Sequence, residues 1–488
     1  MTVDGREGAQ VGRSLTFRLA TNTIVQAAGI LAAAAIGFFT FVAVTRGLGP
    51  EAFGDFTAAT VFLFIPVVIA DIGFSTAVLR EISASPERTE RAMRASLPFR
   101  AFVSAGVVAV AAAVGVLLPL NDRTTVAILI GAVGSFLTLM TLALLPVLQA
   151  QLRMHWAVAG NVTGRLVTLG LTLAALGVGL GFKSVVAAQV VGIAVTFVVH
   201  LYAVGRTVPL RPVVDPQYWR SLVAGSIVIG LAIGLSQIYF RVDTVLLALF
   251  RSSEEVGLYG AAYKFIEIAQ FMAAAVAVSM FPPLAGFVAS GDPRARALVQ
   301  KSFDVLLAGG VFLFVLMLAF PEEIITVSAG PDYREAENAL QLLAPYVLFG
   351  FVNAGLWRAL LAKERDRLLL TTAVAVLVLN VALNLVLIPQ YGYKAAAVIS
   401  VVSEAAILAP IAWAVRQDGL LPDLRYARLV VIAGLATAAV AWGVPGPAIV
   451  AATLATVLYA AILLAAPGTV NEVARSLLPA LRRRSAAT

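Results

Sequence analysis

Four basic side chains lie within stretches of sequence that are otherwise apolar enough to cross a membrane. An isolated cation at the centre of a bilayer costs roughly 3 kcal/mol on insertion scales, so such residues persist where they face a polar cavity, a partner or an anionic ligand. Arginine binds phosphate or carboxylate groups through paired hydrogen bonds, and lysine binds them as a point charge. The candidate anion-binding residues are Arg165, Arg241, Lys264 and Arg358.

Two of these cations have a structural alternative to ligand binding. Arg165 lies near the middle of its apolar stretch and is either a cavity cation or the ion-pair partner of an acid on another helix, such as Asp71. Lys264 and Glu267 share a helix face at i and i+3, which favours an internal ion pair. A change in the protonation of Glu267, or cation binding there, would release Lys264 for a ligand. Both interpretations stay open.

Three arginines lie nearer to helix ends. The side chain of Arg358 is long enough to reach the membrane surface, and the same holds for two further binding candidates, Arg80 and Arg18. Anchoring at the cytoplasmic surface explains all three as well as anion binding does.

Acidic and amide side chains occur in the same apolar stretches. Acids within membrane spans are the usual sites of coupling to H⁺ or Na⁺, and ion pairing is the alternative. An Asn pair at i and i+4 on one helix face serves helix–helix hydrogen bonding or lines a polar cavity. The acidic candidates are Asp71, Asp243, Glu267 and Glu404, and the amides are Asn380 and Asn384.

The composition predicts a membrane protein. The chain has 488 residues, of which 60% are hydrophobic and 13% charged, with a mean hydropathy of +0.93. Open sheet edges cannot persist in lipid, so the predicted fold class is an all-α polytopic bundle. Without cysteine, and with two histidines near predicted helix ends, the chain is expected to have no metal site, no cofactor and no catalytic residue of these types.

Hydropathy predicts about fourteen transmembrane helices. Most of the 35 basic residues, Arg100 among them, then fall on the side of the N-terminus. The positive-inside rule therefore places both termini in the cytoplasm, and this distribution argues against nucleic acid as a partner. The predicted spans are 19–45, 56–79, 99–120, 125–148, 156–179, 184–204, 222–249, 256–281, 303–320, 339–361, 368–388, 394–415, 428–444 and 446–466.

Two pairs of similar segments indicate an internal repeat. EAFGDF at 51–56 aligns with EEVGLY at 254–259, and GFKSVVAA at 181–188 aligns with GYKAAA at 392–397. An even number of predicted helices separates the members of each pair, so the repeat is parallel. The predicted organisation is a cytoplasmic segment 1–18, an N-lobe 19–204, a cytoplasmic linker 205–221, a C-lobe 222–415, two appended helices within 416–466 and a cytoplasmic basic tail 467–488.

Several motifs resemble those of bacterial polysaccharide flippases. They are RGLGPEAFGDF at 46–56, DIGFSTAVLREI at 71–82, RVDTVLLALF at 241–250, SEEVGLYGAAYK at 253–264, FPPL at 281–284, NVALNLVLIPQYGYKAAA at 380–397 and the Ser403-Glu404 pair. Together they resemble the Wzx-type translocases of the multidrug/oligosaccharidyl-lipid/polysaccharide exporter superfamily, and the resemblance covers residues 15–415.

The resemblance implies a transporter with two six-helix lobes, alternating access and a cationic central cavity. Its implied activity is transfer of a polyprenyl-diphosphate-linked oligosaccharide from the cytoplasmic to the outer leaflet of a bacterial plasma membrane, for cell-surface polysaccharide biosynthesis. Its expected partners are the lipid-linked oligosaccharide, the lipid bilayer and other polysaccharide assembly proteins. H⁺ or Na⁺ coupling stays open.

Three alternatives stay open beside this function. A multidrug or cation antiporter of the same superfamily fits less well, because intramembrane cations repel cationic drugs. A lipid-linked peptidoglycan precursor fits as an alternative substrate. A membrane-embedded glycan polymerase or transferase belongs to a different class, and the sequence shows neither a Walker-type loop nor an organised acidic signature for it.

Overall fold

Helices joined by short connections make up most of the described chain in a computed structural model of the protein. No strand occurs among the described residues, and this confirms the predicted all-α class. The structure describes residues 5–71, 73–465, 468–472 and 475, with side chains except at 5–21, 23–24, 225, 227–233 and 235–236.

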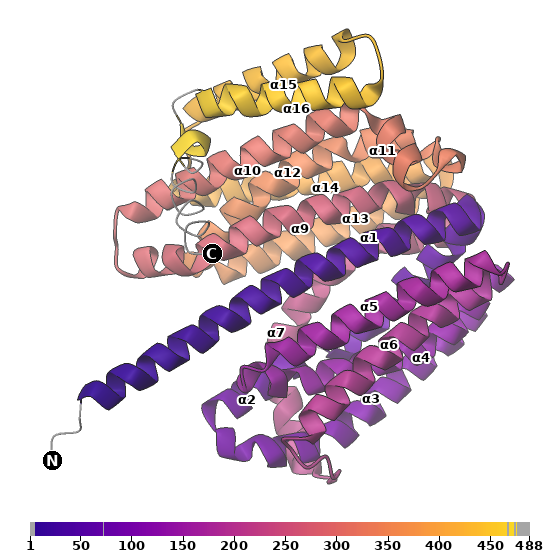
Figure 1. The fold of residues 1–488 in the computed structure, drawn as a ribbon, viewed down its shortest axis with the longest axis vertical. Coiled ribbons are helices and arrows are strands. Elements are labelled where there is room, and N and C mark those ends of the chain that lie inside the picture. The colour runs from indigo at the N-terminus through magenta and orange to yellow at the C-terminus, as the bar shows by residue number, and fades with distance from the viewer. Residues whose placement is uncertain (1–4, 72, 466–467, 473–474, 476–488) are drawn as a thin grey trace, which may run out of the picture. The chain divides into compact units, whose positions relative to one another are not determined.

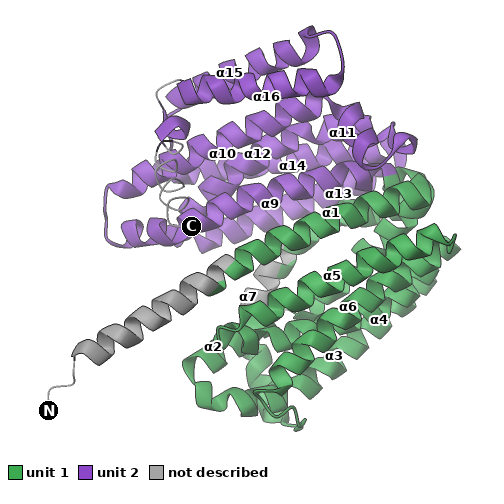
Figure 2. Ribbon diagram, in the orientation of Figure 1, with its two compact units in different colours: residues 1–257 green, residues 258–488 purple. Residues whose placement is uncertain are grey.

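The chain divides into two compact units, residues 1–257 and 258–488 (Figure 2). The domain ranges predicted from the sequence stay predictions. Unit 1 contains α1 (Gly5–Asp71), α2 (Phe74–Ala84), α3 (Thr89–Leu117), α4 (Asp122–Ala150), α5 (Met154–Gly177), α6 (Phe182–Gly205), α7 (Pro216–Tyr239), α8 (Val242–Phe250) and the start of α9 (Ser253–Ala289) (Figure 1). Unit 2 contains the rest of α9, α10 (Arg294–Ala319), α11 (Pro321–Ser328), α12 (Ala336–Ala362), α13 (Asp366–Tyr391), α14 (Tyr393–Gln417), α15 (Arg425–Gly443) and α16 (Ala448–Ala465).

Among the described residues, 12 helical stretches are long and apolar enough to cross a membrane. The first of them, Val25–Ala84, has 60 residues and is long enough for two crossings, since about 20 residues span the hydrocarbon core. With α7 added, these stretches agree with the predicted number of spans. The protein is therefore a multi-pass membrane protein.

The first two predicted spans form a single long element. We expected a loop between 19–45 and 56–79, but α1 continues through this region and breaks only at Gly49, where φ is 74° and ψ is 173°. Glycine adopts this conformation without steric cost, and Pro50 begins the next helical turn. The rings of Phe41 and Phe53 contact each other across the break, with centroids 5.8 Å apart.

The second predicted span is also divided, because α1 ends at Asp71 and α2 begins at Phe74, and Arg100 of α3 stabilises the end of α1. Its guanidinium donates to the carbonyl of Ala70 at 2.9 Å, to Oδ1 of Asp71 at 2.7 Å and to the carbonyl of Leu139 at 3.3 Å. The Arg100 side chain is 1% exposed, although the sequence places this residue in the cytoplasmic set. The cation thus satisfies a helix C-terminus inside the membrane protein and joins α1, α3 and α4.

Helices α5 and α6 approach so closely that glycine is required at the contact. A Cβ on Gly164 would lie 2.5 Å from the carbonyl oxygen of Gly192, and a Cβ on Gly192 would lie 2.5 Å from that of Gly164. Thr196 of α6 donates to the carbonyl of Gly160 at 3.2 Å. Small residues allow close backbone approach between membrane helices, so this contact sets the rotation of α5 about its axis.

In unit 2, α10, α12 and α14 form the interior and α15–α16 pack on α10. Tyr459 of α16 donates to the carbonyl of Ala308 at 2.7 Å, and a Cβ on Gly434 of α15 would meet Val311 at 2.7 Å. Many apolar side chains of α15 and α16 that face away from α10 are exposed, including those of Leu435 and Ile449. The appended pair therefore presents an apolar surface suited to lipid.

Replacement of Arg100 tests the interruption after Asp71. We expect Arg100→Ala to lower the free energy of unfolding by about 3 kcal/mol, because Asp71 and the Ala70 carbonyl lose their partner inside the protein. Thermal unfolding of the purified protein in detergent measures this loss. The matched control is Arg88→Ala, at an exposed arginine outside the spans. Equal unfolding temperatures for the two variants would contradict the assignment.

Candidate functional site

Arg165 is an exposed cation in the middle of α5. No hydrogen bond or ion pair joins its side chain to another of the described residues. Its guanidinium lies over Gly37 of α1, where a Cβ would be 2.8 Å from Nη1. Because an arginine in contact with lipid tails is costly, the exposed face of this group must meet water or an anionic ligand. Arg165 therefore has the surroundings of a binding residue.

Asp71, the alternative partner of Arg165, forms an ion pair with a different arginine. The sequence leaves open an ion pair between Arg165 and Asp71, and the structure pairs Asp71 with Arg100 instead. Ser75 also donates to Oδ1 of Asp71, at 2.8 Å. Asp71 is thus part of the structural interruption between α1 and α2. Its predicted role in coupling stays untested.

Arg241 lies at a break that the sequence does not predict. The span expected over 222–249 is divided into α7 and α8, and Arg241 is the residue that precedes the first turn of α8. Its guanidinium carbon lies 5.3 Å from the centre of the Phe64 ring. Asp243 is 3% exposed and accepts from the backbone N–H of Thr244 at 2.6 Å. Interrupted helices of this kind are a feature of substrate sites in transporters.

Lys264 and Glu267 form the ion pair that their spacing predicts. Lys264 Nζ lies 2.9 Å from Oε2 of Glu267, and their side chains are 33% and 27% exposed. Since neither side chain is fully covered, Lys264 could reach a ligand if Glu267 released it. The structure thus shows the paired state.

The remaining basic candidates differ in surroundings. Arg358 is half-buried, with its guanidinium carbon 5.8 Å from the centre of the Phe281 ring. Arg80 is exposed on α2. The side chain of Arg18 lies outside the described residues. These three binding predictions stay predictions.

Unit 2 contains a buried polar cluster built on Glu404. Asn353 of α12 donates to Oε1 of Glu404 at 2.9 Å and to its backbone carbonyl at 2.8 Å. On α13, Asn384 donates to Oδ1 of Asn380 at 2.9 Å, and Asn380 donates to Ser403 of α14 at 3.0 Å. The amide pair thus joins α13 to α14, as the helix-packing alternative predicts. Asn353 carries no signal in the sequence that would select it.

Two oxygens of this cluster remain without a donor. The Oδ1 atoms of Asn353 and Asn384 are buried and accept no hydrogen bond from any described residue. Buried acceptors of this kind are costly unless water, a proton donor or a cation reaches them. Asn353, which donates to Glu404, and Asn384, which donates to Asn380, thus each keep one acceptor that no described group engages.

The two copies of the first repeat motif meet each other directly. A Cβ on Gly54 would overlap the Ser253 carbonyl, and a Cβ on Gly257 would overlap the Pro50 carbonyl. Asp55 is 0% exposed, and its Oδ1 accepts from Asn121 at 2.6 Å and also from Ser253. The aligned glycines thus form a backbone contact that Asp55 reinforces.

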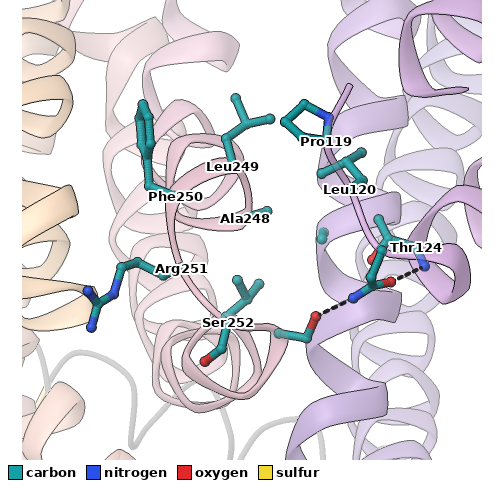
Figure 3. A pocket seen from close by; sticks show the side chains of 12 residues that line it. Pro119, Leu120, Thr124, Ala248, Leu249, Phe250, Arg251 and Ser252 are labelled. Carbon is teal, nitrogen blue, oxygen red and sulfur yellow. Dashed lines mark hydrogen bonds between the residues drawn. The ribbon is translucent and has the colours of Figure 1, made fainter. Parts of the chain in front are cut away.

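A cavity of about 300 Å³ includes Asn121 and Ser253, both partners of Asp55, in its lining. Figure 3 shows this cavity from close by. It is lined by Pro119, Leu120 and Thr124 on one side and by residues 248–252 on the other. Its one basic residue, Arg251, forms an ion pair with Glu255 at 2.7 Å, and the hydrogen bond in this pair raises the pKa of Arg251. The charge of Arg251 is therefore already compensated.

A protein-family model described as "Polysaccharide biosynthesis protein" matches residues 19–288, which contain Arg165, Arg241 and the Lys264–Glu267 pair. The chain belongs to this family. A second model, MatE, matches residues 229–386. Both matches agree with the predicted resemblance to Wzx-type members of the exporter superfamily, which is confirmed.

Two curated relatives of this family member are similar over part of their length. It is 22% identical over 258 residues to the probable low-salt glycan biosynthesis flippase Agl15 of Haloferax volcanii, which covers 53% of the chain and 54% of the relative. It is 22% identical over 323 residues to a putative O-antigen transporter of Escherichia coli (strain K12), covering 63% of the chain and 74% of the relative. The match thus spans about half the length of the first relative.

Solved structures share the fold of this family member. The inward closed conformation of the lipid II flippase MurJ has a TM-score of 0.75 at 12% identity, covering 90% of the chain and 99% of that structure. An inward-facing multidrug resistance MATE family transporter of the MOP superfamily has a TM-score of 0.64 at 16% identity, covering 81% and 98%. At these identities the likeness establishes the fold.

Paired replacement tests whether Lys264 and Glu267 act as a unit. We expect Glu267→Met to destabilise the protein by about 2 kcal/mol, because it leaves a cation within a span without this partner. The double variant Lys264→Met/Glu267→Met should recover most of that loss. Thermal unfolding in detergent measures both. A double variant less stable than Glu267→Met would show that the two side chains contribute independently.

Proposed function

We propose that the protein is a flippase for a polyprenyl-diphosphate-linked oligosaccharide. It would move this lipid from the cytoplasmic to the outer leaflet of a bacterial plasma membrane for cell-surface polysaccharide biosynthesis, as a transporter and not as an enzyme. The family match and the names of the two curated relatives, a glycan biosynthesis flippase and an O-antigen transporter, support this proposal.

The surroundings of Arg165 carry the proposal. A diphosphate cannot enter a membrane protein without compensation of its charge, and an arginine that no described acid engages supplies that charge. Arg100, by contrast, is fully used within the structure. Arg241 and Lys264 would add charge to the same substrate headgroup. The lipid tails would stay in the bilayer while the headgroup crosses.

Alternating access would require the contact between the Gly54 and Gly257 segments to open and close. The contact consists of backbone against backbone together with hydrogen bonds to Asp55, so it can part without breaking an apolar core. Both termini would lie in the cytoplasm, where the basic residues gather. Other polysaccharide assembly proteins would supply and receive the lipid-linked glycan.

Two other substrates are outcomes of the same test. The likeness to a lipid II flippase makes a lipid-linked peptidoglycan precursor a reasonable second substrate, and it also carries a diphosphate. The likeness to a multidrug transporter makes cationic drugs a third, which an exposed arginine disfavours. A reconstituted assay with all three separates them.

Removal of either candidate arginine should impair flipping. We expect Arg165→Ala and Arg241→Ala to raise the half-saturating level of a fluorescent polyprenyl-diphosphate disaccharide about 10- to 100-fold, the effect of losing a charge-assisted hydrogen bond. Flipping in proteoliposomes measures this. The control is Arg296→Ala, an exposed arginine at the start of α10.

The outcomes of this assay discriminate among the functions. Normal flipping in both variants would refute cationic binding of the substrate. Transport of a cationic drug without flipping of any diphosphate lipid would favour the antiporter. Sugar transfer or polymerisation by the purified protein would favour an enzyme.

We also propose that Glu404 couples flipping to H⁺ or Na⁺. Its carboxylate is 6% exposed, and two buried amide oxygens without donors belong to the same cluster. A proton or a sodium ion would compensate the buried charge, and its release would reorganise the hydrogen bonds to Asn353. The other predicted coupling candidates, Asp71, Asp243 and Glu267, also make contacts, with Arg100, Thr244 and Lys264 respectively.

Loss of the Glu404 charge should remove the response to ion gradients. We expect an imposed proton or sodium gradient to accelerate flipping by the unaltered protein, whereas Glu404→Gln should flip at a rate independent of either gradient. Flipping rates in proteoliposomes with controlled internal buffer measure this. The control is Glu254→Gln, at an exposed acid near the start of α9. A full gradient response in Glu404→Gln would exclude the assignment.

A further inference from the structure

Gly37 provides the surface on which the Arg165 guanidinium lies. A Cβ at this position would be 2.8 Å from Nη1 and 4.0 Å from Cζ of Arg165. Apart from neighbouring parts of α1, no other atom of the described residues lies within 4 Å of that point. The absence of a side chain at Gly37 thus makes room for one group alone, the end of the Arg165 side chain.

The neighbouring glycines of α1 show what such a position usually accepts. Gly29 faces Val158, and Gly47 faces Leu176 at 2.5 Å, both from α5. Along the line where α1 and α5 pack, two of three glycines therefore receive an apolar side chain. Arg165 occupies the position between them. An apolar residue would fill that space without the cost of desolvating a charge, so packing alone does not account for the arginine.

The rotation of α5 is set independently of Arg165. The reciprocal contact of Gly164 with Gly192 fixes which face of α5 meets α6. Arg165 follows Gly164 directly and so projects from a different face of the helix. The packing of α5 on α6 therefore determines the direction in which the Arg165 side chain projects, and Gly37 determines where its guanidinium lies.

The internal repeat gives this position a counterpart. Gly54 aligns with Gly257, and the same alignment carried back along the chain without gaps pairs Gly37 with Phe240 and Phe38 with Arg241. The second repeat therefore has an arginine at the break between α7 and α8, one residue beyond the position that aligns with Gly37. The first repeat has Phe38 at the position that aligns with Arg241, and Arg165 of α5 reaches the adjacent Gly37. Each repeat thus supplies one guanidinium at an equivalent level.

We propose that Gly37 is a positioning residue for the diphosphate headgroup. By leaving the α1 backbone bare, it sets the guanidinium of Arg165 at the level in the first repeat that Arg241 occupies in the second, so that one cation from each repeat meets the same anionic group. This role rests on the proposed flippase function. It assigns no new ligand and explains how the existing cation is held.

A double-mutant cycle tests the role of Gly37. The nearest atom to an added Cβ is the far end of a flexible side chain, so Gly37→Ala should displace the guanidinium while leaving the fold intact. We expect this variant to raise the half-saturating level of the fluorescent polyprenyl-diphosphate disaccharide about tenfold, with the maximal flipping rate unchanged. In an Arg165→Lys background, Gly37→Ala should have no further effect, because lysine lacks the forked end that meets the Cβ.

A matched control separates positioning from packing. Gly106 lies within α3, and a Cβ there would meet no atom within 4 Å. Gly106→Ala should change neither the half-saturating level nor the maximal rate. The unfolding temperatures of the two alanine variants should agree, because both gain the same helix propensity.

Three results would overturn the inference. An equal effect of Gly37→Ala in the unaltered protein and in the Arg165→Lys background would show a general packing role. A normal half-saturating level in Gly37→Ala, with Arg165→Ala impaired, would refute positioning and leave the flippase proposal standing. Normal behaviour of both variants would refute cationic binding by Arg165 and with it the basis of this inference.

Discussion

The need to satisfy every polar group within hydrocarbon governs this structure. Backbone groups freed by a break in a membrane helix must find partners, and a charge placed there must be compensated. Arg100 meets both needs at the end of α1, because a single guanidinium donates to the buried Ala70 carbonyl and to the Asp71 carboxylate. The same requirement makes Arg165 informative, since no described group meets it.

Close packing between small residues orients the helices and so positions the polar side chains that they bear. Gly164 and Gly192 bring α5 and α6 into backbone contact, and Gly54 and Gly257 do the same for the two copies of the repeat motif. Such contacts depend on the shapes of the helices and not on apolar area. They therefore stay specific in lipid, whose tails are as apolar as the side chains. A transporter can separate contacts of this kind without exposing a large apolar core.

The polar residues within the spans fall into three physical states. Some are fully satisfied, as in the pair of Arg100 and Asp71. Others have spare acceptor capacity, as in the amides near Glu404. Arg165 is exposed and has no described polar partner. We propose substrate binding by Arg165 and ion coupling at Glu404, whereas the pair of Arg100 and Asp71 stabilises the structure.

The sequence by itself determined the helical class, the approximate number of spans and the family, and it left the pairing of Lys264 with Glu267 as one of two alternatives. Hydropathy over 20 residues and i,i+3 spacing are local properties, so they can be interpreted without knowledge of the fold. Only the tertiary structure showed that Arg100 forms an ion pair with Asp71, that Asn353 contacts Glu404 and that the Arg165 guanidinium lies over Gly37. Each of these depends on which helices become neighbours and how each is rotated, and no local pattern in one chain encodes that.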